Sequence, residues 1–206
     1  MCYLKKFFKH FKLVCKHKWY VFLACCEAGI PWRGIKHDMS KFSPIEFLNS
    51  VKYYTGDRSP IDNEKDDKGY SYAWLHHRGR NPHHWEYWID NLSSGGHALK
   101  IPYNCVKEMI CDWIGSGKAY LGKRWSREET YNFFMKKKRN DDIKLNVYTE
   151  KFIRTILYLY ATSNNYTIGE IFNNFDEYSY NHPSIDDDNF IVFYSKTSRE
   201  NTKGLL

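Results

Sequence analysis

The sequence predicts an all-α protein, a helical bundle followed by a small irregular C-terminal appendage. Apolar residues recur at i, i+3 and i+4 over several stretches, which is the pattern of helices with one buried face. Gly, Pro and Asn separate these stretches, and 42% of the 206 residues are hydrophobic, so a core can form without disulfides. We expect a helical domain over residues 1–160 and an extension over 161–206, which is either a small strand pair or a loosely packed tail.

The first predicted helix begins at Leu4 and ends before Gly29 and Pro31. Its first half is amphipathic, with lysines between apolar residues at positions 4, 7, 8, 11, 14 and 15, and we expect this apolar face to pack on the bundle. An anionic membrane or a partner protein is the alternative cover for this face. After Leu13 the helix is apolar nearly all round, which predicts that it enters the core there, beside His17.

Shorter elements are expected in the next sixty residues or so. Ser43, Pro44 and Glu46 form an N-cap, a first-turn proline and a capping glutamate, which predict that a helix starts at Pro44. The expected order is a non-periodic segment at 34–42, a helix at 44–54, a polar loop at 56–69, helical segments at 70–77 and 83–89, and a turn-rich loop at 91–96.

Two long amphipathic helices complete the predicted bundle. Residues 103–120 repeat apolar side chains every third or fourth position, and so do residues 149–160. The segment between them, 123–144, is charged and less periodic, and no clear helix is predicted there.

Composition argues against several classes of protein. The longest apolar run, at 19–26, is far shorter than the roughly 20 residues of a transmembrane helix, and the basic N-terminus lacks the cleavage site of a secretory signal. The six cysteines include no C-x-x-C pair, which argues against zinc ribbons and thioredoxin chemistry and favours a reducing, cytoplasmic location. The net charge of +7 permits a polyanionic partner but indicates nucleic acid only weakly.

Histidines and aspartates beside the predicted helices are the candidates for chemistry. They are His17, His37, Asp38, His76, His77, His83, His84 and Asp112. Imidazole and carboxylate are common ligands of divalent metals, and a bridging carboxylate holds two ions about 3.5–4 Å apart. The set therefore favours a metal site if the fold brings its members together.

Each member alone also has an ordinary explanation. A single histidine such as His17 is commonly hydrogen-bonded within a core, and a pair such as His37-Asp38 commonly lies in a loop. The ordinary explanation for the histidines at 76, 77, 83 and 84 is a surface stacking patch, but this pair of doublets is harder to dismiss because its rings are costly to bury without partners. Asp112 lies among apolar residues and needs a cation or a donor, which a Lys, an Arg or a Tyr would supply as well as a metal.

Taken in chain order, the set resembles the HD-domain superfamily of metal-dependent phosphohydrolases. In that superfamily an all-α bundle holds one or two divalent metals through a histidine, a His-Asp doublet, further histidines in two-metal members and a final aspartate. Carried over by position, the resemblance implies the metal ligands His17, His37, Asp38, His77, His83 and Asp112. His76 and His84 are the alternatives to their neighbours, and the implied ions are Mn, Fe, Mg, Co, Ni or Zn.

Residues 37–42 strengthen the resemblance. They read His-Asp-Met-Ser-Lys-Phe and are similar to the H-D-x-G-K form of the superfamily, with Ser40 in place of glycine. This register implies that Lys41 contacts the substrate phosphate and that Asp38 takes part in catalysis. At closer range, the segments HDMSKF, HHRGRNPHHWEYW and EMICDW are similar to an uncharacterised family of small bacterial and phage proteins over about residues 15–155.

The resemblance implies a phosphomonoesterase or phosphodiesterase that acts on a small phosphorylated substrate, a nucleotide or a nucleotide-like molecule. The residues expected to bind this substrate are Lys41, Arg33, Arg80 and Asn81. The alternative is a non-catalytic helical module that binds nucleotide or nucleic acid through the basic runs at 5–18 and 136–139.

Overall fold

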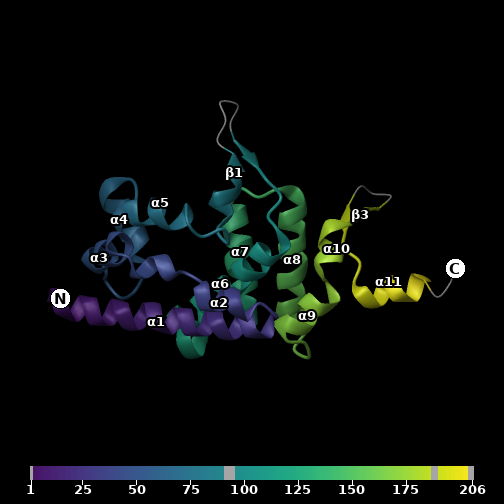
Figure 1. Ribbon diagram of the computed structural model, residues 1–206, viewed down its shortest axis with the longest axis horizontal. Coiled ribbons are helices and arrows are strands. Elements are labelled where there is room, and N and C mark those ends of the chain that lie inside the picture. Colours follow the sequence, from purple (N-terminus) through teal and green to yellow (C-terminus); the bar gives the residue numbers. More distant parts are fainter. Residues whose placement is uncertain (1, 91–95, 187–189, 204–206) are drawn as a thin grey trace.

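The helix α1 (Tyr3–Glu27) runs along the lower side of the molecule in Figure 1. The computed structural model describes residues 2–90, 96–186 and 190–203. Over these residues the all-α prediction is confirmed, because eleven α-helices are present and every strand has only two residues. None of the helices in these ranges has the length and apolar character needed to cross a bilayer.

The elements after α1 fall into three successive groups along the chain. The first group holds α2 (Pro31–Lys36), η1 (Met39–Phe42), α3 (Pro44–Tyr53), α4 (Pro60–Lys68) and α5 (Tyr72–Arg78). The second holds η2 (Trp85–Trp88), the antiparallel pair β1 (Ile89–Asp90) and β2 (His97–Ala98), α6 (Tyr103–Leu121), η3 (Gly122–Arg124), α7 (Arg127–Arg139) and α8 (Val147–Thr162). The third holds α9 (Ile168–Asn174), α10 (Glu177–Asn181), the antiparallel pair β3 (Ser184–Ile185) and β4 (Ile191–Val192), and α11 (Lys196–Lys203).

The helices α1 and α6 pack closely at a glycine. A Cβ built on Gly115 would lie 2.4 Å from Val21 Cγ2 and 2.8 Å from the Val21 backbone nitrogen, which real Cβ atoms do not approach. The missing side chain at Gly115 therefore lets the two backbones come close together. His17 lies one turn before Val21 and Asp112 one turn before Gly115, so this contact brings the two side chains face to face.

One hydrophobic core joins the bundle to the C-terminal extension. Buried side chains of α6 and α8, such as Ile110 and Phe152, are continuous with Phe172, Tyr180 and Phe193. The extension, which the sequence leaves undecided, contains short helices and a minimal strand pair, and its apolar residues pack against the bundle.

Two helices occupy segments in which the sequence predicts none. α4 lies within the expected loop at 56–69, and α7 lies within the charged segment at 123–144. The loop prediction is wrong because α4 is almost wholly polar and shows no apolar period. Its start nevertheless carries a signal, since Ser59 caps the helix and Pro60 is its first residue, the same Ser-Pro pair that begins α3.

Smaller differences concern the connections. The non-periodic segment at 34–42 holds the end of α2 and the 3-10 turn η1. The segment at 83–89 contains the 3-10 turn η2 and the first residue of β1 in place of an α-helix. Of the loop expected at 91–96, residues 91–95 lie outside the described residues.

The predicted packing of the α1 apolar face is confirmed only in part: Val14 is buried and the ring centroids of Phe7 and Phe47 lie 5.1 Å apart, but other members of the face are exposed. Leu4 and Phe8 are each 65% exposed, and Phe11 is 45% exposed. The buried face of the helix shares only Val14 with the predicted apolar face and is formed by His10, Val14, His17, Val21, Ala24 and Cys25. For the exposed members the prediction fails because it rests on hydrophobic residues alone, which leaves histidine out. In the structure His10 and His17 belong to the buried face.

A buried carboxylate ties α3, α4 and α5 together. Glu64 is 1% exposed and accepts hydrogen bonds from Asn49 Nδ2 at 2.6 Å, Ser71 Oγ at 2.6 Å and Lys68 Nζ at 3.0 Å. Burial raises the pKa of Glu64, but these donors outweigh it and lower the pKa to about 2. Because Ser71 also caps α5, Glu64 fixes that helix against α3.

We predict that Gly115→Ala lowers the free energy of unfolding by about 1–3 kcal/mol, because the new methyl group overlaps Val21. Gly79→Ala is the matched control, since its Cβ would meet its nearest neighbour, Leu75 O, at 3.4 Å with an ordinary backbone conformation. Equilibrium urea denaturation measures both variants. Equal stabilities would contradict the close contact of α1 and α6.

A second prediction concerns acid stability. Because its folded pKa is depressed, Glu64 contributes stability above its ordinary pKa of 4.5, and this contribution is lost as the pH falls towards 2. We expect Glu64→Gln to be about 1–3 kcal/mol less stable than the parent at pH 7, and this difference to shrink as the pH falls from 4.5 to 2. Asp66→Asn, on the exposed side of the same helix, is the control and should cost much less stability at pH 7, because an exposed ion pair contributes little. Urea denaturation across this pH range measures the effect.

Candidate metal centre

The carboxylate of Asp38 lies at the centre of the candidate site. Asp38 precedes η1 with a left-handed backbone, φ 53° and ψ 27°, which costs a non-glycine residue about 1 kcal/mol. Its Oδ2 lies 3.1 Å from His37 Nε2 and 3.3 Å from His17 Nε2. Its Oδ1 lies 3.2 Å from His77 Nε2 and 3.3 Å from His83 Nε2. Asp38 thus presents one oxygen to each of two groups of donors.

Donor set A comprises four buried residues: His17, His37, Asp38 and Asp112. They come from α1, from the turn after α2 and from α6. Asp112 Oδ1 lies 3.2 Å from His17 Nε2 and 3.3 Å from His37 Nε2. The two Nε2 atoms are 3.4 Å apart, so the four donor atoms surround one small volume.

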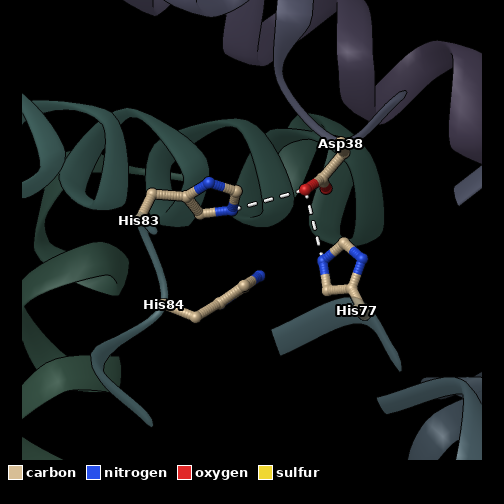
Figure 2. A group of neighbouring side chains, drawn as sticks. All are labelled: Asp38, His77, His83 and His84. Carbon is tan, nitrogen blue, oxygen red and sulfur yellow. Dashed lines mark ion pairs between the residues drawn. The ribbon is translucent and has the colours of Figure 1, made fainter. Parts of the chain in front are cut away.

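Donor set B comprises Asp38, His77, His83 and His84, whose donor atoms lie within 4.8 Å of one another. His77 belongs to the last turn of α5, and the other two histidines follow the turn that leads from α5 to η2. In Figure 2 the rings of His77 and His83 approach the Asp38 carboxylate from different sides, and His84 points into the space between them. The two sets share Asp38.

Five donor atoms in these sets are buried without a hydrogen-bond partner among the described residues. They are Asp38 Oδ1, Asp112 Oδ1 and the Nε2 atoms of His77, His83 and His84. Each unsatisfied buried polar atom costs roughly 1–3 kcal/mol. Two ligands that lie about 2.0–2.2 Å from one ion at tetrahedral or octahedral angles are separated by about 3–3.5 Å. The donor chemistry of both sets and the spacing in set A therefore fit a divalent metal ion.

Glu108 of α6 supports one histidine of each set from outside. Its Oε1 accepts hydrogen bonds from His37 Nδ1 at 3.0 Å and from His83 Nδ1 at 3.1 Å, and its Oε2 pairs with Arg33 Nε at 2.7 Å. Burial raises the pKa of Glu108, but its hydrogen bonds with the two histidines outweigh this and lower the pKa to about 2. Because Nδ1 of each ring is held by the carboxylate, Nε2 is the nitrogen directed at Asp38.

Glu46 of α3 plays the same part for α5. Its Oε2 accepts a hydrogen bond from His77 Nδ1 at 2.7 Å, and its Oε1 accepts one from His76 Nδ1 at 2.6 Å. Asn81 Nδ2 donates to Ser40 Oγ at 2.9 Å and to His77 O at 2.7 Å, which fixes the backbone beside the ring. His76 therefore lies on Glu46, outside donor set B.

The surroundings of Asp38 and His84 favour the ionised carboxylate and the neutral imidazole, which are the protonation states that bind a cation. Burial raises the pKa of Asp38, but the charges of His37, Lys41 and His77 outweigh it and lower the pKa well below its ordinary value. Burial, together with His83, lowers the pKa of His84 far below its ordinary value, so that its ring is neutral and carries a free lone pair.

Lys41 places its ammonium group against the shared carboxylate of the donor sets. Its Nζ lies 2.5 Å from Asp38 Oδ2. Burial lowers the pKa of Lys41, but the carboxylates of Asp38 and Asp112 more than offset it, so the net pKa is raised. The side chain therefore presents an ammonium group at the edge of set A.

A cavity of about 840 Å³ adjoins the donor sets. Its lining includes His17, Lys41, His77, His84 and Asp112. Residues of α4 and α5 and residues of α6 and α7 complete it, and its aromatic members are Trp74, Trp85, Trp113, Tyr120 and Phe133. Donor sets, ammonium group and aromatic rings thus face one shared space.

The structure gives other partners to three residues expected to bind substrate. Arg33 pairs with Glu108, Asn81 holds Ser40 and the His77 backbone, and Arg80 NH1 bonds the exposed His76 carbonyl at 3.4 Å. None of the three lines the cavity. Arg33 and Asn81 act on the site through the residues that they position.

Two supporting residues have no assigned role in the sequence analysis. Glu108 lies one turn before Asp112 on the same helix face, and this i, i+4 spacing was the available signal. Glu46 carries only a helix-start signal, which explains its position but not its bonds to histidine. His84 joins donor set B together with His83, not as its replacement.

The comparisons with known proteins give a family but no activity. A family model described as "Family of unknown function (DUF5662)" matches residues 6–159, which include every residue of both donor sets. No curated protein and no solved structure matches the chain.

We predict that purified protein saturated with Mn²⁺ and then desalted retains the metal, measured by elemental mass spectrometry. Asp38→Ala removes the shared ligand and should abolish retention, whereas Asp112→Ala and His84→Ala should each lower the bound metal per chain. Glu108→Gln should weaken binding about 10–100-fold, because it frees the rings of His37 and His83.

His76→Ala is the matched control, since His76 is adjacent to His77 but bonds Glu46. Thermal denaturation followed by circular dichroism verifies that each variant is folded. Equal metal retention by folded Asp38→Ala and His76→Ala proteins would contradict the assignment of the donor sets.

Proposed function

Since the chain belongs to DUF5662, a family of unknown function, we propose its function from the site: a metal-dependent phosphohydrolase that cleaves a nucleotide or nucleotide-like phosphoester. One observation carries the proposal. The buried carboxylate of Asp38 is shared by two sets of imidazole and carboxylate donors, and Lys41 lies beside it at the cavity. The two donor sets have room for one or two metal cations, and Lys41 offers a positive charge to a phosphate anion beside them.

The residues of sets A and B would hold the ions, with Asp38 serving both. Divalent ions held there supply Lewis acidity to a phosphoryl group and lower the pKa of water that attacks it. The mixture of imidazole and carboxylate suits Mn, Fe, Co, Ni or Zn better than Mg, which prefers oxygen ligands. The number of metal ions bound per chain, measured by elemental mass spectrometry, distinguishes a one-metal site from a two-metal site.

Lys41 is the residue that binds the substrate phosphate in this proposal. Its ammonium group would neutralise the negative charge of the phosphoryl oxygens, which otherwise repels an attacking nucleophile. The contact with Asp38 Oδ2 fixes the ammonium group at the donor sets, so its position does not depend on the substrate. Lys41 therefore both attracts the phosphate and aligns it with the donor sets.

The cavity holds the rest of the substrate. Trp74, Trp113 and Tyr120 line it and present flat apolar surfaces on which a base can stack. Its volume of about 840 Å³ lies within the usual range of ligand pockets, about 300–1,000 Å³. A mononucleotide, a cyclic nucleotide and a larger phosphorylated nucleotide are the classes to compare.

The non-catalytic module is the weaker proposal. Its basic run at 136–139 partly lines the cavity, through Lys136 and Lys137, so phosphate binding there is compatible with the fold. It gives no role to the five buried donor atoms that lack a hydrogen-bond partner among the described residues, whereas metal binding would satisfy them. It predicts salt-sensitive nucleic-acid binding in protein free of metal.

We predict hydrolysis of nucleotide phosphoesters by the protein loaded with Mn²⁺, Co²⁺, Ni²⁺ or Fe²⁺. The assay measures release of phosphate or nucleoside from nucleoside monophosphates, cyclic nucleotides and a generic phosphodiester. Lys41→Ala should lower kcat/KM at least about 100-fold, because it removes the cation that neutralises the phosphoryl oxygens.

Lys123→Ala, an exposed lysine of η3 outside the cavity lining, is the control for charge. Metal content is measured on both variants, so that loss of phosphate binding is separated from loss of metal. Metal-loaded parent protein that cleaves none of these substrates would overturn the proposed function.

A further inference from the structure

The helix α1 carries a second apolar face that the bundle does not cover. Leu4, Phe8, Phe11, Cys15 and Trp19 follow one another at spacings of three or four residues and form a continuous stripe. Leu4 and Phe8 are 65% exposed, Trp19 is 58% exposed, and Cys15 is also exposed. His17 and Val21, which pack inward, lie on another face of the same helix.

Neighbouring elements widen this stripe. Phe42 of η1 contacts Phe11, with ring centroids 6.2 Å apart, and Lys18 Nζ bonds the Ile35 carbonyl of α2 at 2.7 Å, so α2 and η1 adjoin the stripe. Trp32 is 74% exposed, and Ile35 and Met39 are exposed as well. We call the stripe together with Trp32, Ile35, Met39 and Phe42 the outer apolar face. Contiguous exposed apolar surface of this kind marks a docking site.

The outer apolar face lies in a strongly positive part of the chain. Residues 1–56 contain ten Lys and Arg but only three acidic residues, and two of these, Asp38 and Glu46, are buried in the candidate metal centre. Lys5, Lys9 and Lys12 are exposed beside the stripe, and none of them forms an ion pair within the described residues. The surface therefore offers aromatic and aliphatic side chains next to unneutralised positive charge.

Apolar side chains exposed next to lysines indicate what kind of partner the outer apolar face binds. Two copies of the face would bring their lysines together, and like charges oppose such pairing. An anionic lipid surface satisfies both components, because headgroups attract the lysines while aromatic rings enter the interfacial layer. We propose that the outer apolar face of α1, α2 and η1 binds an anionic lipid surface, on which α1 lies flat.

Phosphatidylcholine vesicles with and without phosphatidylglycerol test the proposal with the full chain, by co-sedimentation and by a blue shift of tryptophan fluorescence. We expect binding only when phosphatidylglycerol is present, and weakening of this binding by added salt. The double variant Phe8→Glu/Trp19→Glu should lower the partition coefficient at least about tenfold, because it places charge on the stripe. Lys9→Gln/Lys12→Gln should lower it about 30-fold, from roughly 1 kcal/mol per lysine.

Tyr158→Glu on α8 is the matched control, since Tyr158 is 53% exposed and outside the outer apolar face. It should bind vesicles as the parent does, and circular dichroism verifies the fold of each variant. Absence of vesicle binding by the parent would overturn the proposal. So would a dimer in light scattering that Phe8→Glu/Trp19→Glu converts to a monomer, because the face would then join two chains. None of these results depends on phosphohydrolase activity.

Discussion

Burial of the Asp38 carboxylate is the constraint on which the rest of the site depends. A carboxylate that is 2% exposed needs donors or cations on both oxygens. The chain provides imidazoles from three separate segments, and Lys41 at the edge. The rings of His37, His77 and His83 are in turn fixed from outside, by Glu108 and Glu46 on Nδ1, so that Nε2 faces inward. The result is a buried group of converging donor atoms. Those that lack a hydrogen-bond partner among the described residues lie at its centre.

The scaffold holds this group by short, specific contacts. α1 and α6 meet at a glycine and thereby bring His17 to Asp112. On the other side, the Glu64 carboxylate ties α5 to α3, so His77 and Glu46 keep their mutual position. The polar helix α4 therefore matters to the site although none of its residues belongs to a donor set.

The sequence predicts the fold class and the long helices because their apolar periods are strong. It also points to the histidines that converge, since a doublet and two histidine pairs are unusual enough to notice. It does not reveal α4, whose stabilising residue Glu64 is polar, or the outer role of Glu108, which depends on contacts with residues far away in the chain. The inner face of α1 is misjudged because buried imidazoles take the places where hydrophobic residues are expected. Pattern identifies which residues are unusual, whereas only the fold gives their partners.

The contact between Gly115 and Val21 also limits how the sequence can drift. There is no room for one added methyl group, and a smaller side chain at 21 does not make room for it, because the methyl would still lie 2.8 Å from the backbone nitrogen of residue 21. A substitution that spread α1 from α6 would carry His17 away from Asp112. Descendants that keep this histidine and aspartate should therefore keep glycine at 115. Conservation of the metal-binding residues therefore requires conservation of a glycine that contacts none of the donor atoms.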